Sequence, residues 1–285
     1  MNHAFRADMH CHTTCSDGTF TPQELLKHAH DRSLQGLSIT DHDTVESYLE
    51  ALPIAESLGI QLVSGVEFST MHQGVSVHVL AYGFSTENPL ILNFCEKHAK
   101  RRIERNRAIL DRIYKYHSVR ITEDDLIQGN KNKGTFGRPH IAQAMVQRGL
   151  AISIQDAFHR FLGEGHCCFE PGDTVDVEQT LECIHAANGK AVIAHPHLIN
   201  NHSIVNQLTE MPFDGIEVYY ARFTEVQVKR WKKLAEKKGW FMTGGSDFHG
   251  SVKPHNPLGA SWAPESTFEF LLKHYQTNLL NVAVS

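Results

Sequence analysis

The chain has no marked excess of charge of one sign and no long apolar run. It carries 27 lysines and arginines against 32 aspartates and glutamates, a net charge of −5 over 285 residues. This balance gives no general attraction to nucleic acids or anionic membranes. No apolar stretch approaches the roughly 18 residues that a membrane-spanning helix needs. Residues 1–6 also lack the pattern of a secretion signal. We therefore expect a cytoplasmic protein that does not bind membranes.

Cysteine is scarce, and no two cysteines have the CxxC spacing of many zinc and redox motifs. The six residues are Cys11, Cys15, Cys95, Cys167, Cys168 and Cys183. A chain of this length does not depend on a disulfide framework, so we expect reduced thiols. The adjacent pair Cys167-Cys168 could serve redox or metal chemistry. We expect instead that both are small, buried side chains.

Short apolar segments alternate with amphipathic segments along most of the chain. Strands are expected near residues 5–9, 36–40, 61–66, 75–82, 191–194, 215–219 and 241–244. Helices are expected near residues 21–32, 45–58, 177–187, 204–210 and 225–238. The first helix begins with a capping box from Thr21 to Glu24, with Pro22 at its first position. About seven strands in a β-α order favour an α/β fold with a parallel sheet or a barrel.

The alternation stops between residues 89 and 170. This stretch has helical patterns near residues 90–116, 138–148 and 153–161, and it contains a polar loop at residues 129–134. We interpret it as an insertion between two strands. The expected organisation is a barrel domain of residues 1–88 and 171–285 and an inserted helical cap domain of residues 89–170. The cap should cover the face where the strand-connecting loops emerge.

Two motifs rich in histidine and carboxylate lie near opposite ends of the chain. One is Asp8-Met-His-Cys-His12, followed by Ser16-Asp-Gly18, and the other is Gly245-Ser-Asp-Phe-His249. Residues i and i+2 of a strand share one face, so His10 pairs with His12 and Asp247 pairs with His249. Residues so distant in sequence can share a metal only if the fold brings both ends together.

Polar residues also follow, or lie within, the intervening strands. They are Asp41, His42, Asp43, Glu67, His78 and His195. Side chains at the carboxyl ends of barrel strands converge on one face, where barrel enzymes have their active sites. We do not expect Asp41 or Asp43 to bind a metal: one would orient His42 and the other would cap the next helix. Glu217 has three possible roles: it could orient a metal ligand, contact the substrate or serve the structure alone.

As a set, these motifs resemble those of the PHP (polymerase and histidinol phosphatase) superfamily. The matching segments are Asp8–His12 with Ser16–Gly18, Thr40–Asp43, Gly65–Glu67, His78, Ala194–Pro196 and Gly245–His249. They occur in order along the whole expected barrel. The motif Gly137-Arg-Pro-His-Ile-Ala142 in the insertion resembles one branch of the superfamily. That branch contains nucleoside 3′,5′-bisphosphate phosphatases and the 5′→3′ exoribonuclease called ribonuclease AM.

The resemblance implies a distorted (β/α)7 barrel of the PHP type with a helical insertion domain and two to three divalent metal ions. The first metal would be held by His10, His12, Glu67 and Asp247, the second by Glu67, His78 and His195, and the third by Asp17, His42 and His249. Asp8 would support these ligands without binding a metal. Six imidazoles and three carboxylates, with no thiolate, suit Mn²⁺ best, with Zn²⁺, Fe²⁺ and Mg²⁺ as alternatives.

The implied reaction is hydrolysis of a nucleotide phosphate ester by a metal-bound hydroxide. The substrate would be a nucleoside 3′,5′-bisphosphate that loses its 3′-phosphate, or a short RNA degraded in the 5′→3′ direction. No obligate protein partner is evident. A histidinol-phosphate phosphatase is the alternative enzyme, and an inactive metal-binding regulatory module is the alternative without catalysis.

Arg138 and His140 are the expected contacts to the substrate phosphate, because arginine binds phosphate oxygens bidentately. Lys131, Lys133 and Arg222 are weaker candidates for a second phosphate. The basic stretch of residues 97–107 could bind RNA, but such a run is more often a solvated helix face.

Overall fold

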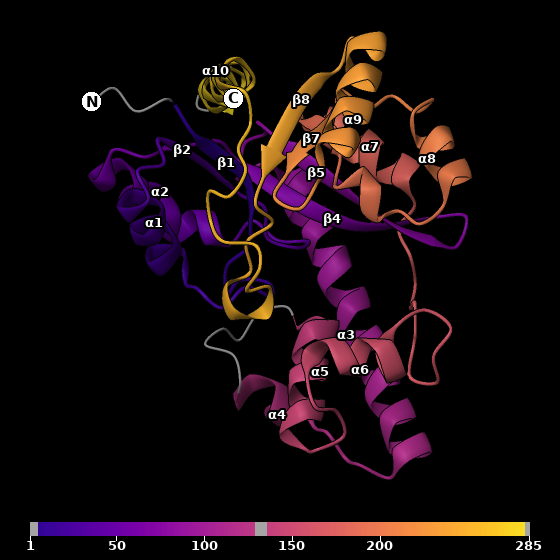
Figure 1. The fold of residues 1–285 in the computed structure, drawn as a ribbon. Coiled ribbons are helices and arrows are strands. Elements are labelled where there is room, and N and C mark those ends of the chain that lie inside the picture. The colour runs from indigo at the N-terminus through magenta and orange to yellow at the C-terminus, as the bar shows by residue number, and fades with distance from the viewer. Residues whose placement is uncertain (1–4, 129–135, 283–285) are drawn as a thin grey trace.

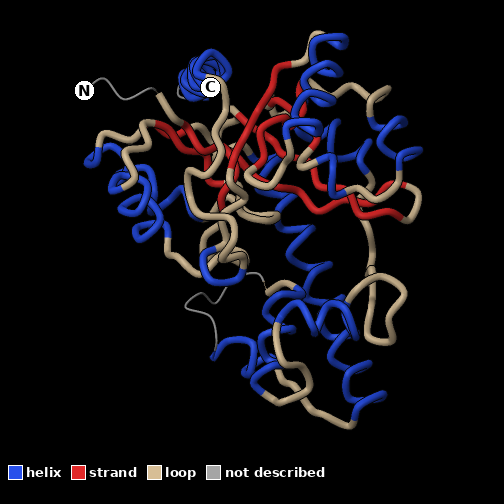
Figure 2. Tube along the Cα trace, viewed as in Figure 1, coloured by secondary structure: helices blue, strands red, loops and turns tan. Residues whose placement is uncertain are grey.

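The computed structural model describes residues 5–128 and 136–282. Within these ranges the strands form two sheets with helices packed around them (Figures 1 and 2). The first sheet consists of the parallel strands β1 (Ala7–Cys11), β2 (Gly36–Ile39) and β3 (Gln61–Leu62). The second sheet contains β4 (Gly65–His72), β5 (Val75–Tyr82), β6 (Lys190–Ile193), β7 (Gly215–Tyr220) and β8 (Phe241–Gly245), in that order. The α/β fold class predicted from the sequence is confirmed.

Strands β4 and β5 depart from the expected β-α alternation. They form an antiparallel hairpin that pairs Gly65 with Tyr82 and His72 with Val75. Its two turn residues, Gln73 and Gly74, have φ values of 49° and 81°, the left-handed conformation that two-residue hairpin turns require. Strand β5 is also antiparallel to β6, whereas β6, β7 and β8 are parallel. The single strand expected at residues 61–66 is therefore wrong, because its end belongs to this hairpin.

Backbone hydrogen bonds join the first sheet to both edges of the second sheet. The N–H of His12 donates to the carbonyl of Phe248 at 2.9 Å, and that of Asp247 donates to the carbonyl of His10 at 2.7 Å. At the other edge, the N–H of Asp43 donates to the carbonyl of Glu67 at 3.0 Å. Over residues 5–128 and 136–282 the strands nevertheless form two separate sheets. The two ends of the chain do lie side by side, as a shared metal site would require.

Helices cover the outer faces of both sheets. They are α1 (Pro22–Asp31), α2 (Ser47–Leu58), α7 (Val177–Ala186), α8 (His202–Leu208), α9 (Glu225–Lys238) and α10 (Glu265–Val282). The predicted capping box of α1 is confirmed: Thr21 Oγ accepts from the N–H of Glu24 at 3.2 Å, and the Glu24 carboxylate accepts from the N–H of Thr21 at 2.8 Å. In the described part of the chain, no helix is long and apolar enough to cross a membrane.

The insertion begins with α3 (Pro89–His117), which extends away from the sheets (Figure 1). Around its far half pack α4 (Glu123–Gln128), α5 (Arg138–Gln147), α6 (Ile154–Ala157) and the π-helical turn η1 (Phe158–Leu162). These elements share an apolar cluster of their own, which includes Ile109, Ile113, Ile141, Met145 and Leu162. The near half of α3 packs on the main core through Ile91, Phe94 and Cys95. One long helix therefore belongs to both apolar clusters.

Candidate metal centre

His10 of β1 and His12, which directly follows the strand, point into a buried space between the two sheets. Strand alternation puts His10 and His12 on one face, both fully buried, with ring centroids 5.3 Å apart. Cys11 lies between them and points the opposite way, where its Sγ donates to the carbonyl of Ser38 at 3.2 Å. The predicted i, i+2 pair is thus formed by the pleat of the strand.

Three residues of the site have a left-handed backbone without being glycine. They are Asp43, His195 and Asp247, with φ values of 59°, 24° and 54°. Each such conformation costs on the order of 1–3 kcal/mol and persists only where the surroundings enforce it. All three follow a strand, so the strained backbone turns their side chains into the space beyond the strand ends.

Glu67 is the carboxylate around which the site is organised. Its Oε2 atom lies 3.2 Å from Nε2 of both His10 and His12 and 3.4 Å from Nδ1 of His42. Its Oε1 atom lies 2.8 Å from Nδ1 of His78 and 2.8 Å from Nε2 of His195. Burial alone would raise the pKa of Glu67, but the surrounding imidazoles, led by His42, hold it well below its usual value. A single ionised carboxylate therefore faces five imidazoles.

A second carboxylate, that of Asp17, contacts His249, the one predicted histidine that does not contact Glu67. Asp17 Oδ1 lies 3.2 Å from Nε2 of His249 and 3.7 Å from Nδ1 of His12, and Asp17 Oδ2 lies 3.8 Å from Nε2 of His42. Asp247 completes the set, with Oδ1 3.5 Å from His10 and 3.3 Å from His12. All nine residues predicted from the sequence thus lie in one cluster.

Three groups within this cluster have ligand atoms within 4.8 Å of one another. They are His10, His12, Glu67 and Asp247; His12, Asp17, His42 and His249; and His42, Glu67 and His78. The first group is the one expected for the first metal. The second group contains the three residues expected for the third metal and adds His12. In the third group His42 joins Glu67 and His78, while His195 contacts the same Glu67 oxygen as His78.

The donor atoms of this cluster fit divalent cations. Both ring nitrogens of His12, Nδ1 of His42, Nδ1 of His195 and Oδ1 of Asp247 are buried, without a hydrogen-bond partner in the described chain. Each unsatisfied buried polar group costs about 1–3 kcal/mol, and native proteins contain few of them. Divalent cations bound through one nitrogen of each imidazole and through the Asp247 oxygen would satisfy several of these atoms.

Two further carboxylates hold the ligands in place. Asp8 accepts backbone hydrogen bonds from His10 at 3.2 Å, Ser246 at 2.9 Å and Gly259 at 2.8 Å, which ties β1 to the segment after β8. Glu217 on β7 lies 2.9 Å from Nδ1 of His10 and accepts from the N–H of His195 at 2.7 Å. Such outer partners fix the orientation of a metal-binding imidazole. Of the roles left open for Glu217, the structure supports orientation of a ligand.

The expected roles of Asp41 and Asp43 are wrong. Asp41 accepts from the N–H and Oγ of Thr13 at 2.7 and 2.6 Å and from Oγ of Ser16 at 2.6 Å, so it fixes the loop after β1. Asp43 accepts from the N–H of Ser69 at 2.7 Å. It also pairs with Arg102 of α3 and lies 3.2 Å from Nδ1 of His98. Neither residue caps α2, because their partners come from remote segments.

Lys253 is a residue of the site that the sequence did not reveal. Its Nζ lies 2.7 Å from Oδ2 of Asp247, and the hydroxyl of Tyr220 donates to the same oxygen at 2.8 Å. Both contacts orient the Asp247 carboxylate so that Oδ1 faces the histidines. No motif marks either residue, since Lys253 lies in a loop and Tyr220 at the end of β7.

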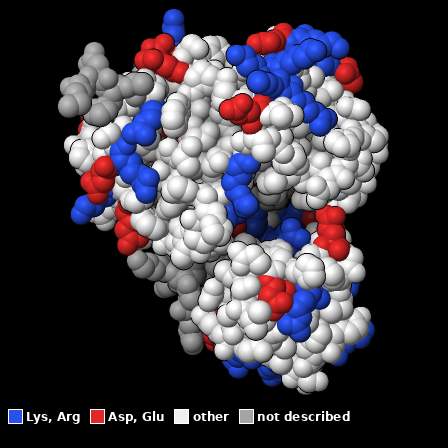
Figure 3. Space-filling view, in the orientation of Figure 1, with Lys and Arg blue, Asp and Glu red and all other residues white. Residues whose placement is uncertain are grey.

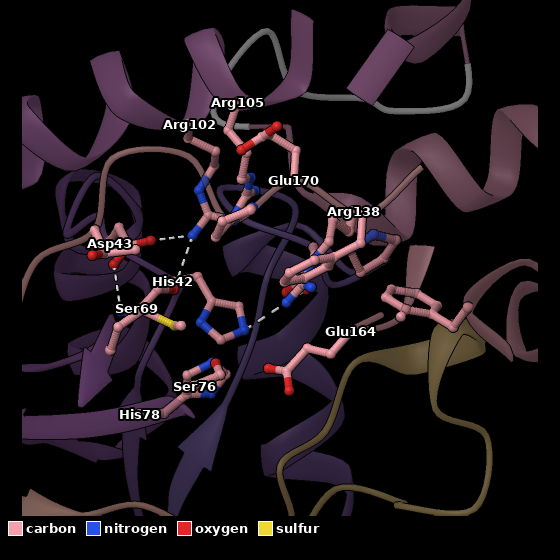
Figure 4. A pocket seen from close by; sticks show the side chains of 18 of the residues that line it. His42, Asp43, Ser69, Ser76, His78, Arg102, Arg105, Arg138, Glu164 and Glu170 are labelled. Atoms are coloured by element: carbon pink, nitrogen blue, oxygen red, sulfur yellow. Dashed lines mark hydrogen bonds and ion pairs between the residues drawn. The ribbon is translucent and has the colours of Figure 1, made fainter. Parts of the chain in front are cut away.

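A cavity of about 750 Å³ lies between the metal-ligand cluster and the insertion. Asp17, His42, His78 and His249 border it on one side. From the insertion, four arginines line it: Arg101, Arg102, Arg105 and Arg138. Figure 3 shows the hollow with lysine and arginine side chains inside it, and Figure 4 shows Arg102 directed at Asp43 and Arg138 near Glu164. The cavity therefore has cations opposite the predicted metal ligands.

Arg105 is half-buried and lies near other cations. Its Nε has no hydrogen-bond partner among the described residues, and its Nη2 lies 3.4 Å from Oδ1 of Asn106. Burial and, after it, the charges of Arg102 and Arg138 together lower the pKa of Arg105 to about 9. An anion in the cavity would relieve this repulsion. The basic stretch of residues 97–107 is divided, because Lys97, Lys100 and Arg107 are solvated.

The predicted phosphate contacts lie on two sides of α5. Arg138 lines the large cavity, whereas His140 lines a neighbouring cavity of about 320 Å³. Nδ1 of His140 accepts from the N–H of Gly137 at 2.9 Å, which stabilises the start of α5. Lys131 and Lys133 lie outside the described residues. Arg222 is exposed and lines neither cavity.

Comparison with known proteins agrees with this geometry. Residues 8–155 match the model of the PHP domain family. The chain is 32% identical over 257 residues to the 5′-3′ exoribonuclease Rnm of Escherichia coli, covering 87% of this chain and 86% of that protein. It is 26% identical over 247 residues to the 3′,5′-nucleoside bisphosphate phosphatase of Chromobacterium violaceum, covering 85% and 86%.

A solved structure shares the fold over nearly the whole chain. It is the crystal structure of a protein from Bifidobacterium adolescentis, described as a putative metal-dependent phosphoesterase. The TM-score is 0.86 at 30% sequence identity, covering 95% of this chain and 97% of that one. The chain therefore belongs to the PHP domain family of metal-dependent phosphoesterases.

Proposed function

We propose that this protein hydrolyses phosphate esters of nucleotides. The observation that carries the proposal is the convergence of nine imidazole and carboxylate side chains beside a cavity lined by four arginines. We propose His10, His12, Asp17, His42, Glu67, His78, His195, Asp247 and His249 as the metal ligands. Divalent ions held there, Mn²⁺ most of all, would activate the attacking water and neutralise charge on the phosphoryl oxygens.

The first candidate substrate is a nucleoside 3′,5′-bisphosphate. A cavity of about 750 Å³ is within the usual range of roughly 300–1,000 Å³ for small-molecule sites. The 3′-phosphate would lie against the metal ligands, and the 5′-phosphate would meet Arg105 or Arg138, whose repulsion it relieves. Metal ligands on one side of the cavity and arginines on the other thus suit a substrate with two phosphates.

The second candidate substrate is a short RNA. The cavity of about 320 Å³ beside His140 shares Asp17, Pro139, Ile154 and Val252 with the large cavity. It therefore adjoins the metal ligands and could receive nucleotides beyond the one under attack. The similarity to a 5′-3′ exoribonuclease supports this candidate.

We also propose that the chain consists of two domains with different roles at the site. Residues 1–88 and 171–285 would act as one distorted (β/α)7 barrel domain, and residues 89–170 as an inserted cap domain. The hydrogen bonds at both sheet edges support the first part, and the separate apolar cluster of the insertion supports the second. In this arrangement the barrel supplies the metal ligands and the cap supplies arginines.

The decisive experiment assays the full chain, loaded with Mn²⁺, on three substrates. They are a nucleoside 3′,5′-bisphosphate, a 5′-phosphorylated RNA oligonucleotide and histidinol phosphate. We expect release of phosphate from the first or of 5′-nucleotides from the second, with loss of both after chelation and recovery with Mn²⁺. Turnover of histidinol phosphate alone would replace the proposal by that activity. If none of the three is hydrolysed, the protein is not the proposed enzyme.

Replacing Arg138 by Ala tests the phosphate contact. Because a hydrogen bond to a charged group contributes about 1.5–3 kcal/mol, we expect kcat/KM to fall by about ten- to a hundredfold. The matched control is Arg148→Ala in the residue that ends the same helix, where the side chain pairs with Asp125 at 2.6 Å on the surface. The control should retain full activity. If both substitutions lowered kcat/KM by the same small factor, Arg138 would not be a phosphate contact.

A further inference from the structure

One imidazole and two thiols cluster in the insertion, apart from the residues that surround Glu67. His117 is the last residue of α3, and Cys167 and Cys168 follow η1. Each offers one ligand atom, and the three atoms lie within 4.8 Å of one another. The expectation of a buried cysteine pair is wrong for Cys167, which is exposed, and correct for Cys168. The proposed phosphoesterase reaction has no use for this group.

The distances within this cluster fit the geometry of a metal site. Nε2 of His117 lies 3.5 Å from Sγ of Cys167, and the two Sγ atoms are 3.7 Å apart. Tetrahedral zinc, with Zn–S near 2.3 Å and Zn–N near 2.0–2.1 Å, places two sulfur ligands about 3.8 Å apart and a sulfur and a nitrogen about 3.6 Å apart. Thiol hydrogen bonds span similar distances, so a direct signal of sulfur–metal bonding is the decisive measurement.

The surroundings allow an ion to enter and be held. Cys167 is exposed and His117 half-buried, so solvent reaches the cluster and water could be the fourth ligand. The ring of His117 packs edge-on against Phe161 at 4.8 Å, which limits its rotation. Arg112, a cation near Cys168, is paired with Glu170 at 2.7 Å.

We propose that His117, Cys167 and Cys168 form a second metal site, selective for thiophilic divalent ions such as Zn²⁺ and Cd²⁺. Two sulfur ligands distinguish it from the nitrogen and oxygen ligands beside the large cavity. The ion would tie the end of α3 to a segment 50 residues later in the chain. That segment includes Glu164, Phe169 and Glu170, which line the large cavity. Binding would therefore stiffen one wall of the cavity without contacting the substrate.

The test is a titration of the reduced full chain with Cd²⁺, followed through the ultraviolet absorption of thiolate–cadmium bonds. We expect a band that saturates at one equivalent of thiolate-bound ion. Cys167→Ser should leave at most the weaker band of a single thiolate and weaken this binding by more than about 100-fold, since losing even an outer partner of a ligand costs up to that much. The matched control is Cys183→Ser, because Cys183 is a half-buried thiol on α7, and it should leave the band unchanged.

A second variant keeps the test decisive if Cys167→Ser does not fold. His117→Gln leaves both thiols in place, and it should weaken Cd²⁺ binding by at least about tenfold. An unchanged affinity in His117→Gln, the same band in Cys167→Ser, or no band in the reduced wild-type protein would each overturn the site. None of these measurements uses substrate, so their outcome is separate from that of the phosphoesterase assay.

Discussion

Replacing Glu67 by Gln is expected to remove nearly all phosphoesterase activity. The Glu67 carboxylate lies between 2.8 and 3.4 Å from nitrogens of five histidines. Glutamine has the same shape, but it carries no charge and presents an NH₂ group in place of one oxygen. Since substitution of an outer partner of a metal ligand already costs ten- to a hundredfold, we expect turnover to fall by more than about 100-fold.

The measurements for this variant are steady-state phosphate release and the metal content of the purified protein. We expect both to fall together, because the same carboxylate would hold two ions. The control is Glu236→Gln in α9, where the side chain is exposed and remote from the cavity. It should match the wild type in both measurements. A Glu67→Gln protein with more than a tenth of wild-type turnover would refute the proposed role of this residue.

Among the substitutions proposed for this protein, Arg102→Ala is expected to lower the free energy of unfolding most. Arg102 comes from α3 and pairs with Asp43, which follows β2, and both side chains are buried. Removing one member of a buried ion pair leaves the other charge uncompensated, which costs about 3–5 kcal/mol. We expect the free energy of unfolding to fall by this amount. The measurement is urea-induced unfolding followed by circular dichroism.

The exposed pair of Lys100 and Glu96 on the same helix provides the control. Its atoms are 2.7 Å apart, and both side chains are well exposed, so Lys100→Ala should cost at most about 0.5 kcal/mol. A loss below about 1 kcal/mol for Arg102→Ala would contradict the predicted cost of an unpaired buried charge.

The pH dependence of this loss has a defined sign. Burial raises the pKa of Asp43, but His98, Arg102 and His42 outweigh it and hold the pKa well below its usual value. A carboxyl with a depressed folded-state pKa stabilises the protein above its unfolded pKa of about 3.9. This stabilisation is lost as the pH falls from there toward the folded-state pKa. The difference between wild type and Arg102→Ala should therefore be constant near neutral pH and shrink only below about pH 4.

Local patterns determined those parts of the fold that depend on neighbours in sequence. The capping box at Thr21 and the helix over residues 225–238 follow from contacts within one or two turns, and both are confirmed. The i, i+2 placement of His10 and His12 follows from the pleat of one strand. The ordered motifs were sufficient to identify all nine residues that the structure brings together.

Contacts between remote segments could be decided only by the tertiary structure. The partner of Asp43 is Arg102, 59 residues later in the chain, and nothing in the sequence around either residue indicates the other. Lys253 and Tyr220 converge on Asp247 for the same reason. The antiparallel pairing of β5 with β6 joins distant residues such as Val79 and Ile193, and the alternation of strands and helices contains no information on its direction. The sequence by itself determined which residues could bind metal ions. The fold decided which carboxylates orient them and which arginines face them, because those contacts exist only after distant segments pack.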